Sequence, residues 1–303
     1  MKVLVTGSAG FVGRHLSAHL AACGDEVATL DRHGEHAVDV TDADAVRAAV
    51  VAARPQIVFH LAAVSHVGAS WDAPAIVFRV NAEGTLHVLR ACVDANVERV
   101  VVVGSADVYG SVTPRDLPLT EDAPLRPLTP YGASKAAADT LALQAFLGDE
   151  LATIRVRAFN HTGPGQGARF LVPGLAGRIA RAERDGQGEV TLGALDPVRD
   201  LSDVRDVVRA YRLLAERGTP GEAYNVCSGT GISVGDIADH LLRLSERSLR
   251  ITVDPSLLRP VDVPRLVGDP AKLRAATGWD PAIPLARTLA DVLAEARDGA
   301  RRG

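Results

Sequence analysis

A tyrosine and a lysine stand four residues apart in the stretch PYGASKAAAD, as Tyr131 and Lys135. Residues at this spacing lie on one face of a helix, and Pro130 suits a helix's first turn. A phenol has a pKa of about 10, so it is a weak acid–base catalyst at neutral pH. A neighbouring ammonium group favours the phenolate and lowers that pKa, which predicts a proton-transfer site. The alternative is a tyrosine packed on a core beside a solvent-exposed lysine.

Three glycines, Gly7, Gly10 and Gly13, follow a short apolar run in VLVTGSAGFVGRHL and precede a helical pattern. Glycines at a strand-to-helix turn let the backbone approach a pyrophosphate closely at the helix N-terminus. The spacing G-x-x-G-x-x-G differs from the commoner G-x-G-x-x-G, but the physical requirement is the same. The stretch therefore predicts a dinucleotide coenzyme site after the first strand.

The end of the second expected strand supplies residues that choose between coenzymes. Asp31 predicts hydrogen bonds to both ribose hydroxyls, which favours NAD, whereas Arg32 beside it suits the 2′-phosphate of NADP. We expect NAD, with NADP as the less favoured alternative. Asp39 and Val40 are expected at the adenine, where a carboxylate accepts from the exocyclic amine. A helix cap, equally suited to Asp42, is the alternative for this acidic stretch.

Strands and helices are expected to alternate through the first half of the chain. Continuous apolar strands separated by helices indicate a parallel sheet covered on both faces. Right-handed crossovers then give a doubly wound α/β fold of the Rossmann type. The expected strands are 3–5, 26–30, 56–61, 99–103 and 152–158, and the expected helices are 12–22, 43–53, 75–95 and 133–147.

The pattern after residue 159 becomes irregular and includes long segments rich in glycine and proline. Such segments inside a compact protein usually carry function. We therefore predict a coenzyme-binding domain over 1–159 and a smaller substrate-binding lobe over 160–199 and 228–303. The segment 200–227, with a helix at 204–216 and a strand at 223–226, is expected to return to the first sheet.

Composition excludes several classes of function. The chain has 303 residues, a formal charge of −4 and 4% aromatic residues, which argues against binding nucleic acid. Its cysteines, Cys23, Cys92 and Cys227, are far apart and no metal-ligand spacing occurs, so we expect neither a metal site nor a disulfide framework. No segment has membrane-spanning length, and MKVLVTG is expected to form a strand rather than a signal peptide. We expect a cytoplasmic protein with no membrane partner.

Five motifs occur in an order that resembles the extended short-chain dehydrogenase/reductase family of nucleotide-sugar enzymes. They are GSAGFVG, HLAA at 60–63, VNAEGT at 80–85, GSADVYG at 104–110 and YGASK at 131–135, and the resemblance covers essentially the whole chain. It implies a catalytic set of Ser105, Tyr131 and Lys135. In that family the tyrosine exchanges a proton with a sugar oxygen and the serine hydrogen-bonds the same oxygen. The lysine keeps the phenol acidic and holds the nicotinamide ribose.

The same resemblance implies further roles. Asn81 is expected to brace the proton path through backbone and water, with a helix-capping asparagine as the alternative. Asp107 matches a position where 4,6-dehydratases carry a proton-removing acid, but related reductases carry an acid there too, so it does not decide the reaction. The implied coenzyme contacts also include Phe11, Val12, Leu61, Ala62, Ala63, Asn81, Tyr131 and Lys135.

The second half of the chain supplies most of the expected contacts to a nucleotide sugar. The stretch RAFNHTGPGQ resembles the GDP-4-keto-6-deoxy-mannose reductases, whereas GDP-mannose dehydratases tend to carry E-S-P-R after N-H. Arginine suits bidentate binding of a diphosphate. The expected substrate contacts are Ser65, His66, Ser105, Asn160, His161, Arg199, Arg259 and Asp262. A packed loop histidine and solvated arginines are the competing interpretations.

These expectations converge on an enzyme that acts on nucleotide sugars with a nicotinamide coenzyme. The expected reaction reduces the 4-keto group of a GDP-4-keto-6-deoxyhexose, and 4-epimerisation and 4,6-dehydration are alternatives that use the same residues. A non-catalytic dinucleotide sensor is the competing class, but such a protein would have lost the Tyr131–Lys135 pair. The resemblance also implies a homodimer in which helices 75–95 and 133–147 pair with those of the partner. Their apolar faces equally suit packing inside a monomer.

Overall fold

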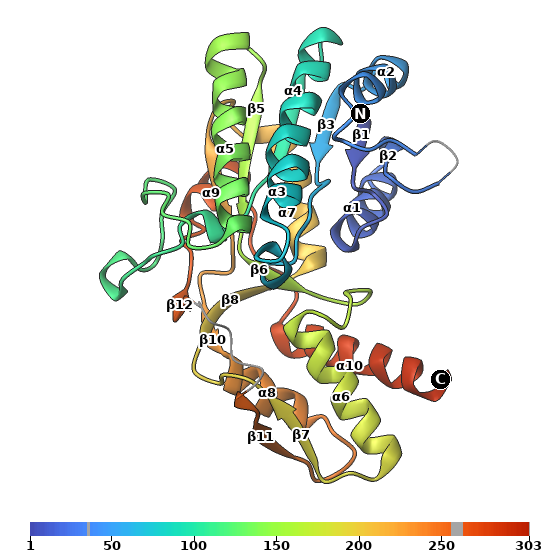
Figure 1. The fold of residues 1–303 in the computed structure, drawn as a ribbon, viewed down its shortest axis with the longest axis vertical. Coiled ribbons are helices and arrows are strands. Elements are labelled where there is room, and N and C mark those ends of the chain that lie inside the picture. The colour runs from blue at the N-terminus through green and yellow to red at the C-terminus, as the bar shows by residue number, and fades with distance from the viewer. Residues whose placement is uncertain (35–36, 256–262, 303) are drawn as a thin grey trace.

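The computed structural model of the chain describes residues 1–34, 37–255 and 263–302 (Figure 1). Two predicted substrate residues, Arg259 and Asp262, therefore lie outside the described residues. The described part has a larger region around one six-stranded sheet and a smaller region of helices and short strands. Among the described helices, none is both long and apolar enough to cross a membrane.

The large sheet is parallel throughout and has the strand order β2-β1-β3-β4-β5-β9. Its strands are β1 (Lys2–Thr6), β2 (Glu26–Leu30), β3 (Ile57–His60), β4 (Arg99–Val103), β5 (Thr153–Ala158) and β9 (Ala223–Val226). All four residues of β3 and of β9 are buried, as expected of strands covered on both faces. The predicted doubly wound α/β fold is confirmed. The chain changes direction across the sheet at β1, and ligands bind at such a switch point in open parallel sheets.

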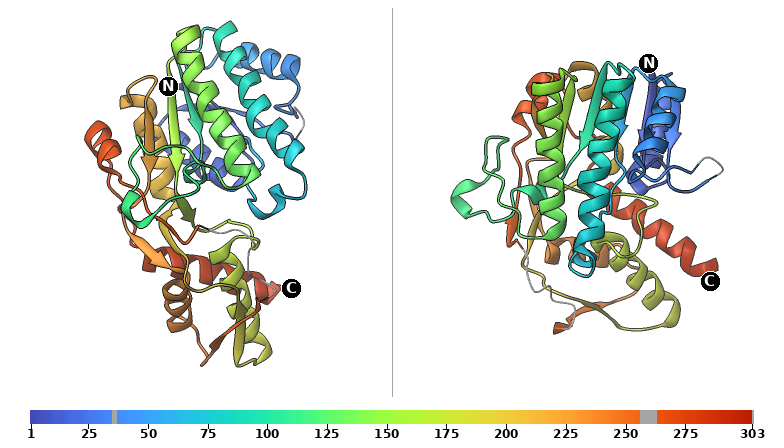
Figure 2. Two further views of the ribbon diagram at one scale, coloured as in Figure 1. Left: turned by 60° about the vertical axis from the view of Figure 1, so that its left-hand side comes forward. Right: turned by 45° about the horizontal axis from the view of Figure 1, so that its top comes forward.

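Helices cover both faces of this sheet (Figures 1 and 2). One buried apolar cluster joins the sheet to α1 (Phe11–Ala22), α7 (Val204–Arg217) and α9 (Ala271–Thr277). A second cluster on the other face joins it to α2 (Ala43–Ala53), α4 (Gly84–Asp94) and α5 (Pro130–Asp149). Each large apolar side chain buried there contributes about 1.5–3 kcal/mol. The α5 helix begins earlier than the sequence predicts, because Thr129 caps it through the Gly132 N–H at 3.0 Å and Pro130 occupies its first turn.

The helix expected over 75–95 contains a wider turn. It consists of α3 (Pro74–Phe78), a π-helical turn η2 (Arg79–Glu83) and then α4. Asn81 lies in the π-helical turn and is 1% exposed. Single π turns inside helices occur frequently at functional sites, because they change which residues face a neighbour. The periodicity of the sequence does not signal this turn.

The smaller region is built from residues after 159. One sheet has four strands: β6 (Asn160–Thr162), β8 (Val198–Asp203), β10 (Gly231–Ser233) and β12 (Arg265–Leu266). A second sheet is the parallel pair of β7 (Glu189–Leu192) and β11 (Arg250–Val253). α6 (Leu171–Asp185), α8 (Val234–Arg243) and α10 (Leu285–Arg302) enclose an apolar core with the β7–β11 pair. Because β5 runs almost directly into β6, the smaller region adjoins the carboxyl ends of the large sheet's strands.

A buried carboxylate ties α5 to the large sheet. Asp139 accepts hydrogen bonds from Arg155 and Arg157 of β5 at 2.7–3.3 Å, and the three side chains are at most 13% exposed. Arg157 also donates to the Tyr109 hydroxyl and to the Glu121 carbonyl oxygen. Buried charges are tolerated only when each is paired and hydrogen-bonded. The cluster therefore fixes α5 on the sheet and anchors the segment before it.

Replacing Asp139 with asparagine should destabilise the fold by about 3–5 kcal/mol, because two buried guanidinium groups lose their counter-charge. Urea unfolding followed by circular dichroism measures the loss. Asp149→Asn is the matched control: Asp149 pairs with Arg90, whose side chain is 57% exposed. That control should cost less than about 1 kcal/mol. Equal stabilities of the two variants would contradict the structural role given to Asp139.

Candidate active site

The predicted coenzyme and catalytic residues gather at the carboxyl ends of the central strands. The glycine loop follows β1, residues 61–63 follow β3, and Ser105 comes shortly after β4. These strand ends adjoin the switch point of the sheet, where parallel sheets open a crevice for ligands. Tyr131 and Lys135 reach the same place from the first turns of α5, where they are 8% and 7% exposed.

The glycine loop has the close packing that a dinucleotide turn requires. Gly7 has a φ of +71°, and a Cβ atom on it would lie 2.8 Å from the Ala62 nitrogen. A Cβ atom on Gly13 would lie 2.2 Å from the Gly7 carbonyl oxygen, so only glycine allows α1 to approach the loop this closely. No described side chain caps the N-terminus of α1, and its first turn holds no acid. This terminus fits a pyrophosphate held by backbone N–H groups.

Asp31 and Arg32 stand next to this loop. The Asp31 carboxylate accepts a hydrogen bond from the Ala9 N–H at 2.9 Å, which holds it against the glycine loop. Arg32 is exposed, and its Nε donates to Nε2 of His33 at 3.1 Å. A carboxylate and a guanidinium are thus adjacent at this corner. The first suits a ribose diol and the second a 2′-phosphate, so the geometry fits both coenzymes.

The two residues predicted to contact adenine differ in their surroundings. Asp39 accepts from the N–H and the hydroxyl of Thr41 at 2.9 and 2.8 Å, and these bonds lower its pKa. The cap of α2 is Asp42, which accepts from the Ala45 N–H at 3.0 Å. Val40 is buried against α4, where a Cβ atom on Gly84 would lie 2.7 Å from its Cγ2. The adenine contact of Asp39 stays a prediction.

Tyr131 belongs to a cluster with Ser105 and Asp107. Ser105 donates to Oδ2 of Asp107 at 3.0 Å and accepts from the Asp107 N–H at 3.2 Å, at the start of the short helix η3 (Ala106–Val108). Burial, and then the Asp107 carboxylate, raise the pKa of Tyr131, while a hydrogen bond with Ser105 lowers it. The protein's own groups therefore keep the phenol protonated at neutral pH.

Lys135 is buried, and its Nζ donates to the Val103 carbonyl oxygen at 2.8 Å. Burial lowers the pKa of Lys135 from 10.5 to about 8. The sequence predicts that Lys135 lowers the pKa of Tyr131, but the protein's own groups raise it. The physical reason is desolvation, which disfavours the charged form of both groups and here outweighs any attraction between them.

A chain of buried hydrogen bonds begins at the first strand. Thr6 bonds Nδ1 of His60 at 2.8 Å, Nε2 of His60 bonds Thr85 at 3.0 Å, and Thr85 donates to the Asn81 carbonyl oxygen at 2.6 Å. Because Thr85 has only one proton to donate, His60 must donate from Nε2 and accept at Nδ1. Burial lowers the pKa of His60 to about 3, so this neutral tautomer persists at ordinary pH.

The side chain of Asn81 continues the chain to α5. It accepts from the Val64 N–H at 2.8 Å and donates to the Val64 carbonyl and to Ser134 at 3.1 and 2.9 Å. Ser134 in turn donates to the Tyr131 carbonyl oxygen at 2.7 Å. Asn81 therefore joins the loop after β3 to the start of α5 rather than capping a helix. Sequence reasoning missed Ser134, although it lies inside the YGASK motif.

Two predicted substrate residues lie in the loop after β3. His66 accepts from the Ala69 N–H at 2.9 Å, and its ring centroid lies 6.3 Å from that of Phe170, the residue before α6. Ser65 is exposed. The loop therefore reaches from the large sheet to the smaller region, and the substrate contacts of Ser65 and His66 stay a prediction.

Three more predicted substrate residues lie on the adjacent strands β6 and β8. Asn160 is exposed on β6, and the half-buried Arg199 of β8 donates to the Val198 carbonyl oxygen at 2.9 Å. His161 donates from Nδ1 to the Phe159 carbonyl oxygen at 2.9 Å, and burial lowers its pKa, so the ring is neutral. His161 also stacks on Phe11, with ring centroids 6.3 Å apart.

Two residues at this site have no motif that would have identified them. Arg14 donates to the carbonyl oxygens of Ala9 and Gly165, and Nε2 of His15 donates to that of Pro164. Both come directly after the last glycine of the coenzyme loop. Their partners in the smaller region are distant in sequence, so no local spacing signals the contact.

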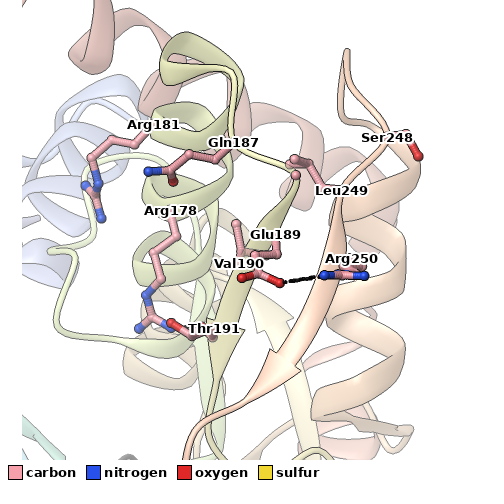
Figure 3. A pocket seen from close by; sticks show the side chains of 10 residues that line it. Arg178, Arg181, Gln187, Glu189, Val190, Thr191, Ser248, Leu249 and Arg250 are labelled. Carbon is pink, nitrogen blue, oxygen red and sulfur yellow. Dashed lines mark hydrogen bonds and ion pairs between the residues drawn. The ribbon is translucent and has the colours of Figure 1, made fainter.

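A large open cavity lies elsewhere, between α6 and the β7–β11 pair (Figure 3). Its volume is about 830 Å³. Arg178 donates to the Thr191 carbonyl oxygen, and Arg250 pairs with Glu189 at 3.2 Å. None of the predicted site residues that the structure describes lines this cavity. Size alone therefore does not identify the candidate active site.

Comparisons with known proteins agree with this geometry. The sequence model of the family described as GDP-mannose 4,6 dehydratase matches residues 4–292. The chain is 34% identical to a GDP-6-deoxy-D-mannose reductase of Pseudomonas aeruginosa, over 97% of this chain and 96% of the reductase.

Two solved structures are also similar. RMD from Pseudomonas aeruginosa, complexed with NADPH, has a TM-score of 0.90 and 33% identity, covering 99% of this chain and 100% of that chain. The UDP-glucose 4-epimerase of Thermus thermophilus, complexed with NAD, has a TM-score of 0.87 and 31% identity, covering 98% of this chain and 99% of that chain. The predicted family resemblance is confirmed.

Lys135 gives the fold a pH dependence. Its pKa is about 8 in the folded protein and 10.5 when exposed, so the unfolded chain binds more protons between these values. Stability should therefore rise with pH across this window. Compared with Lys135→Met, the wild-type protein should gain about 2 kcal/mol between pH 8 and pH 10. Urea unfolding of both proteins measures the difference, and a difference independent of pH would contradict the assignment.

Proposed function

We propose that this chain, which belongs to the GDP-mannose 4,6-dehydratase family of extended short-chain dehydrogenases/reductases, reduces the 4-keto group of a GDP-4-keto-6-deoxyhexose with a nicotinamide coenzyme. The observation that carries the proposal is the cluster at the end of β4 in which Ser105 and Tyr131 are buried and Asp107 is half-buried, with the buried Lys135 one turn after Tyr131 on α5. The similarity to a GDP-6-deoxy-D-mannose reductase over nearly the whole chain supports the substrate and the direction.

Proton transfer is the role proposed for Tyr131. A bound nicotinamide coenzyme supplies the hydride to the carbonyl carbon. Tyr131 then gives its proton to the carbonyl oxygen, on which negative charge develops. The raised pKa suits this direction, because the phenol stays protonated at neutral pH while an alkoxide is more basic than a phenolate. Ser105 donates a hydrogen bond to the same oxygen and must leave Asp107 to do so.

The roles of Lys135 and Asn81 follow from their contacts. With a pKa of about 8, Lys135 is mostly protonated at neutral pH. Its ammonium group is proposed to hold a ribose hydroxyl and to stabilise the phenolate that proton transfer leaves behind. Asn81 acts indirectly, since it fixes the first turn of α5 through Ser134 and thereby the position of Tyr131.

The two regions of the fold are proposed to divide the ligands. Residues 1–159 with 200–227 would bind the coenzyme, and residues 160–199 with 228–303 would bind the nucleotide sugar. The separate apolar cores of the large sheet and of α6, α8 and α10 support this division. The predicted bounds differ from the structure at two segments: α9 packs in the core of the large sheet, and residues 200–203 of β8 pair within the smaller sheet. NAD and NADP both remain candidates, because Asp31 favours the first while a similar structure contains NADPH. The expected preference for NAD is kept as a proposal.

Epimerisation at C4 is the second candidate reaction. The similarity to a UDP-glucose 4-epimerase that contains NAD, which extends over nearly the whole chain, supports it. An epimerase oxidises C4 and then returns the hydride, so Tyr131 acts in turn as base and acid. The reaction would use the same Ser105, Tyr131 and Lys135, and it would consume no coenzyme overall.

The absorbance of NADH and NADPH with GDP-4-keto-6-deoxy-mannose tests the proposed reduction. We expect stoichiometric loss of one coenzyme, and Tyr131→Phe should lower kcat by roughly 10²–10⁴-fold. Tyr224→Phe is the matched control, since that buried hydroxyl accepts from the Thr219 N–H and is not among the predicted site residues. If the absorbance of NADH and NADPH does not fall and UDP- or GDP-sugar epimers form, 4-epimerisation replaces 4-keto reduction as the proposed function. Unchanged turnover in Tyr131→Phe would refute the catalytic assignment.

We also propose that the chain forms a homodimer through α3, α4 and α5. Ile76, Phe78 and Leu147 on these helices are 60%, 50% and 71% exposed. A mostly apolar hollow of about 600 Å³ lies between these helices, with Phe78, Leu86 and Leu141 in its wall. Exposed apolar patches of this kind mark protein–protein contacts.

Light scattering should give twice the chain mass of 31.8 kDa. Phe78→Asp should shift the protein toward monomer, because it places a charge in the proposed contact. Val51→Asp on α2 changes an apolar residue of similar exposure, 48%, and should leave the dimer intact. A wild-type mass of one chain would exclude the homodimer.

A further inference from the structure

Arg14 bonds two segments that belong to different predicted ligand sites. Its Nη1 donates to the Ala9 carbonyl oxygen at 2.7 Å, and its Nη2 donates to the Gly165 carbonyl oxygen at 3.1 Å. Ala9 lies in the glycine loop of the predicted coenzyme site. Gly165 lies in the loop that directly follows the predicted substrate residues Asn160 and His161.

Hydrogen bonds extend this contact in both directions. The Ala9 N–H donates to Asp31 at 2.9 Å, and the Gly165 N–H donates to Oε2 of Glu295 at 2.7 Å. A continuous path therefore runs from the predicted ribose carboxylate through Arg14 to α10 in the smaller region. Gly165 has a φ of +85°, which favours glycine, so the turn that presents its carbonyl group to Arg14 is specified by the sequence.

Two more residues of α1, His15 and Phe11, contact this loop and the strand β6 before it. Nε2 of His15 donates to the Pro164 carbonyl oxygen at 2.8 Å. Phe11 stacks on His161 at 6.3 Å and meets the His15 ring edge-on at 5.4 Å. Phe11, Arg14 and His15 have the spacing of one helix face. That face contacts residues 161–165, while the N-terminus of the same helix adjoins the glycine loop.

The chemistry of arginine suits a link between two carbonyl groups. A guanidinium is planar, always charged and carries its donors in a fixed fork, so two carbonyl groups bonded to it keep a fixed separation. Its charge also strengthens both hydrogen bonds. Lysine has the same charge, but its single ammonium group on a flexible stem cannot fix two acceptors in this way.

We propose that Arg14 is a positioning residue that couples the coenzyme site to the sugar-nucleotide site, an inference that rests on the proposed function for the identity of both ligands. Coenzyme bound at the glycine loop reduces the motion of Ala9. Because Arg14 is bonded to the carbonyl oxygens of both Ala9 and Gly165, the motion of Gly165 is reduced as well. The loop after Asn160 and His161 is then ordered before the sugar nucleotide arrives. A loop that is already ordered loses less conformational entropy when the second ligand binds. By linkage, the sugar nucleotide must raise coenzyme affinity by the same factor.

Hydrogen–deuterium exchange of the full chain tests the coupling without any sugar substrate. Saturating NADPH, or NADH in a parallel series, should slow amide exchange in a peptide over 160–167 by about fivefold or more in the wild-type protein. Arg14→Ala at its own saturating coenzyme concentration should lose this slowing. A purely structural role would change melting temperature without removing the response to coenzyme.

Three further variants test whether the response to coenzyme needs the two donors of the guanidinium, needs only a positive charge, or is lost through a general disturbance of the fold. Arg14→Lys keeps the charge but not the fork and should behave like Arg14→Ala. Arg47→Ala removes an exposed arginine paired with Asp94 on the far side of the sheet and should behave like the wild-type protein. If Arg14→Ala does not fold, Glu295→Gln weakens the other end of the path and should reduce the slowing.

Calorimetric titration with GDP supplies the second measurement. NADPH should tighten GDP binding in the wild-type protein by about fivefold or more and should not do so in Arg14→Ala. If coenzyme slows amide exchange over 160–167 but GDP does not bind, the proposed GDP-linked substrate is wrong while the coupling between the two segments stands. The coupling itself is overturned if coenzyme does not bind or leaves the loop's exchange unchanged in the wild-type protein. Retained slowing in Arg14→Ala or in Arg14→Lys would overturn it equally.

Discussion

The pairing of one buried carboxylate with two buried arginines fixes the frame on which the candidate active site depends. Asp139 holds α5 against β5, and Tyr131 stands two turns earlier on that helix. Arg157 extends the same network to the hydroxyl of Tyr109, which ends the short segment that begins at Ser105. The Tyr131 phenol and Ser105 therefore lie close together because α5 and the segment 105–109 are both bonded to the same charge cluster. The charged groups of this cluster are not among the predicted ligand contacts, yet they set the distances within the site.

Much of this organisation is readable from the sequence, because its causes are local. Apolar strands and intervening helices identify the parallel sheet, and the glycines after β1 identify the turn. Several elements, including β2 and α2, begin and end at the expected residues, since Leu30 ends an apolar run and Asp42 is a natural cap. The proposed catalytic residues follow from motifs after β4 and at the start of α5, which the topology brings together at one edge of the sheet.

The remaining features depend on contacts between distant segments or on burial, and neither leaves a local pattern. Arg14 finds Gly165 only once the smaller region has folded. The π-helical turn at Asn81 arises because that side chain bonds a loop and another helix, which overrides the ordinary helical period. The sign of the pKa shift of Tyr131 depends on how deeply the phenol is buried, and a four-residue spacing does not reveal that depth. Adjacent residues such as Asp31 and Arg32 likewise leave the coenzyme undecided.

The position of β9 at the end of the large sheet has a consequence for synthesis on the ribosome. β5 is complete long before β9, because β6, α6, β7, β8 and α7 come between them in the chain. At roughly 5–20 residues per second, the edge of β5 stays unpaired for several seconds while these elements emerge. A strand edge left open in this way can pair with another chain. The order of the strands thus makes the nascent protein most vulnerable to aggregation after its first half is made, and the late return of the chain to the sheet closes that interval.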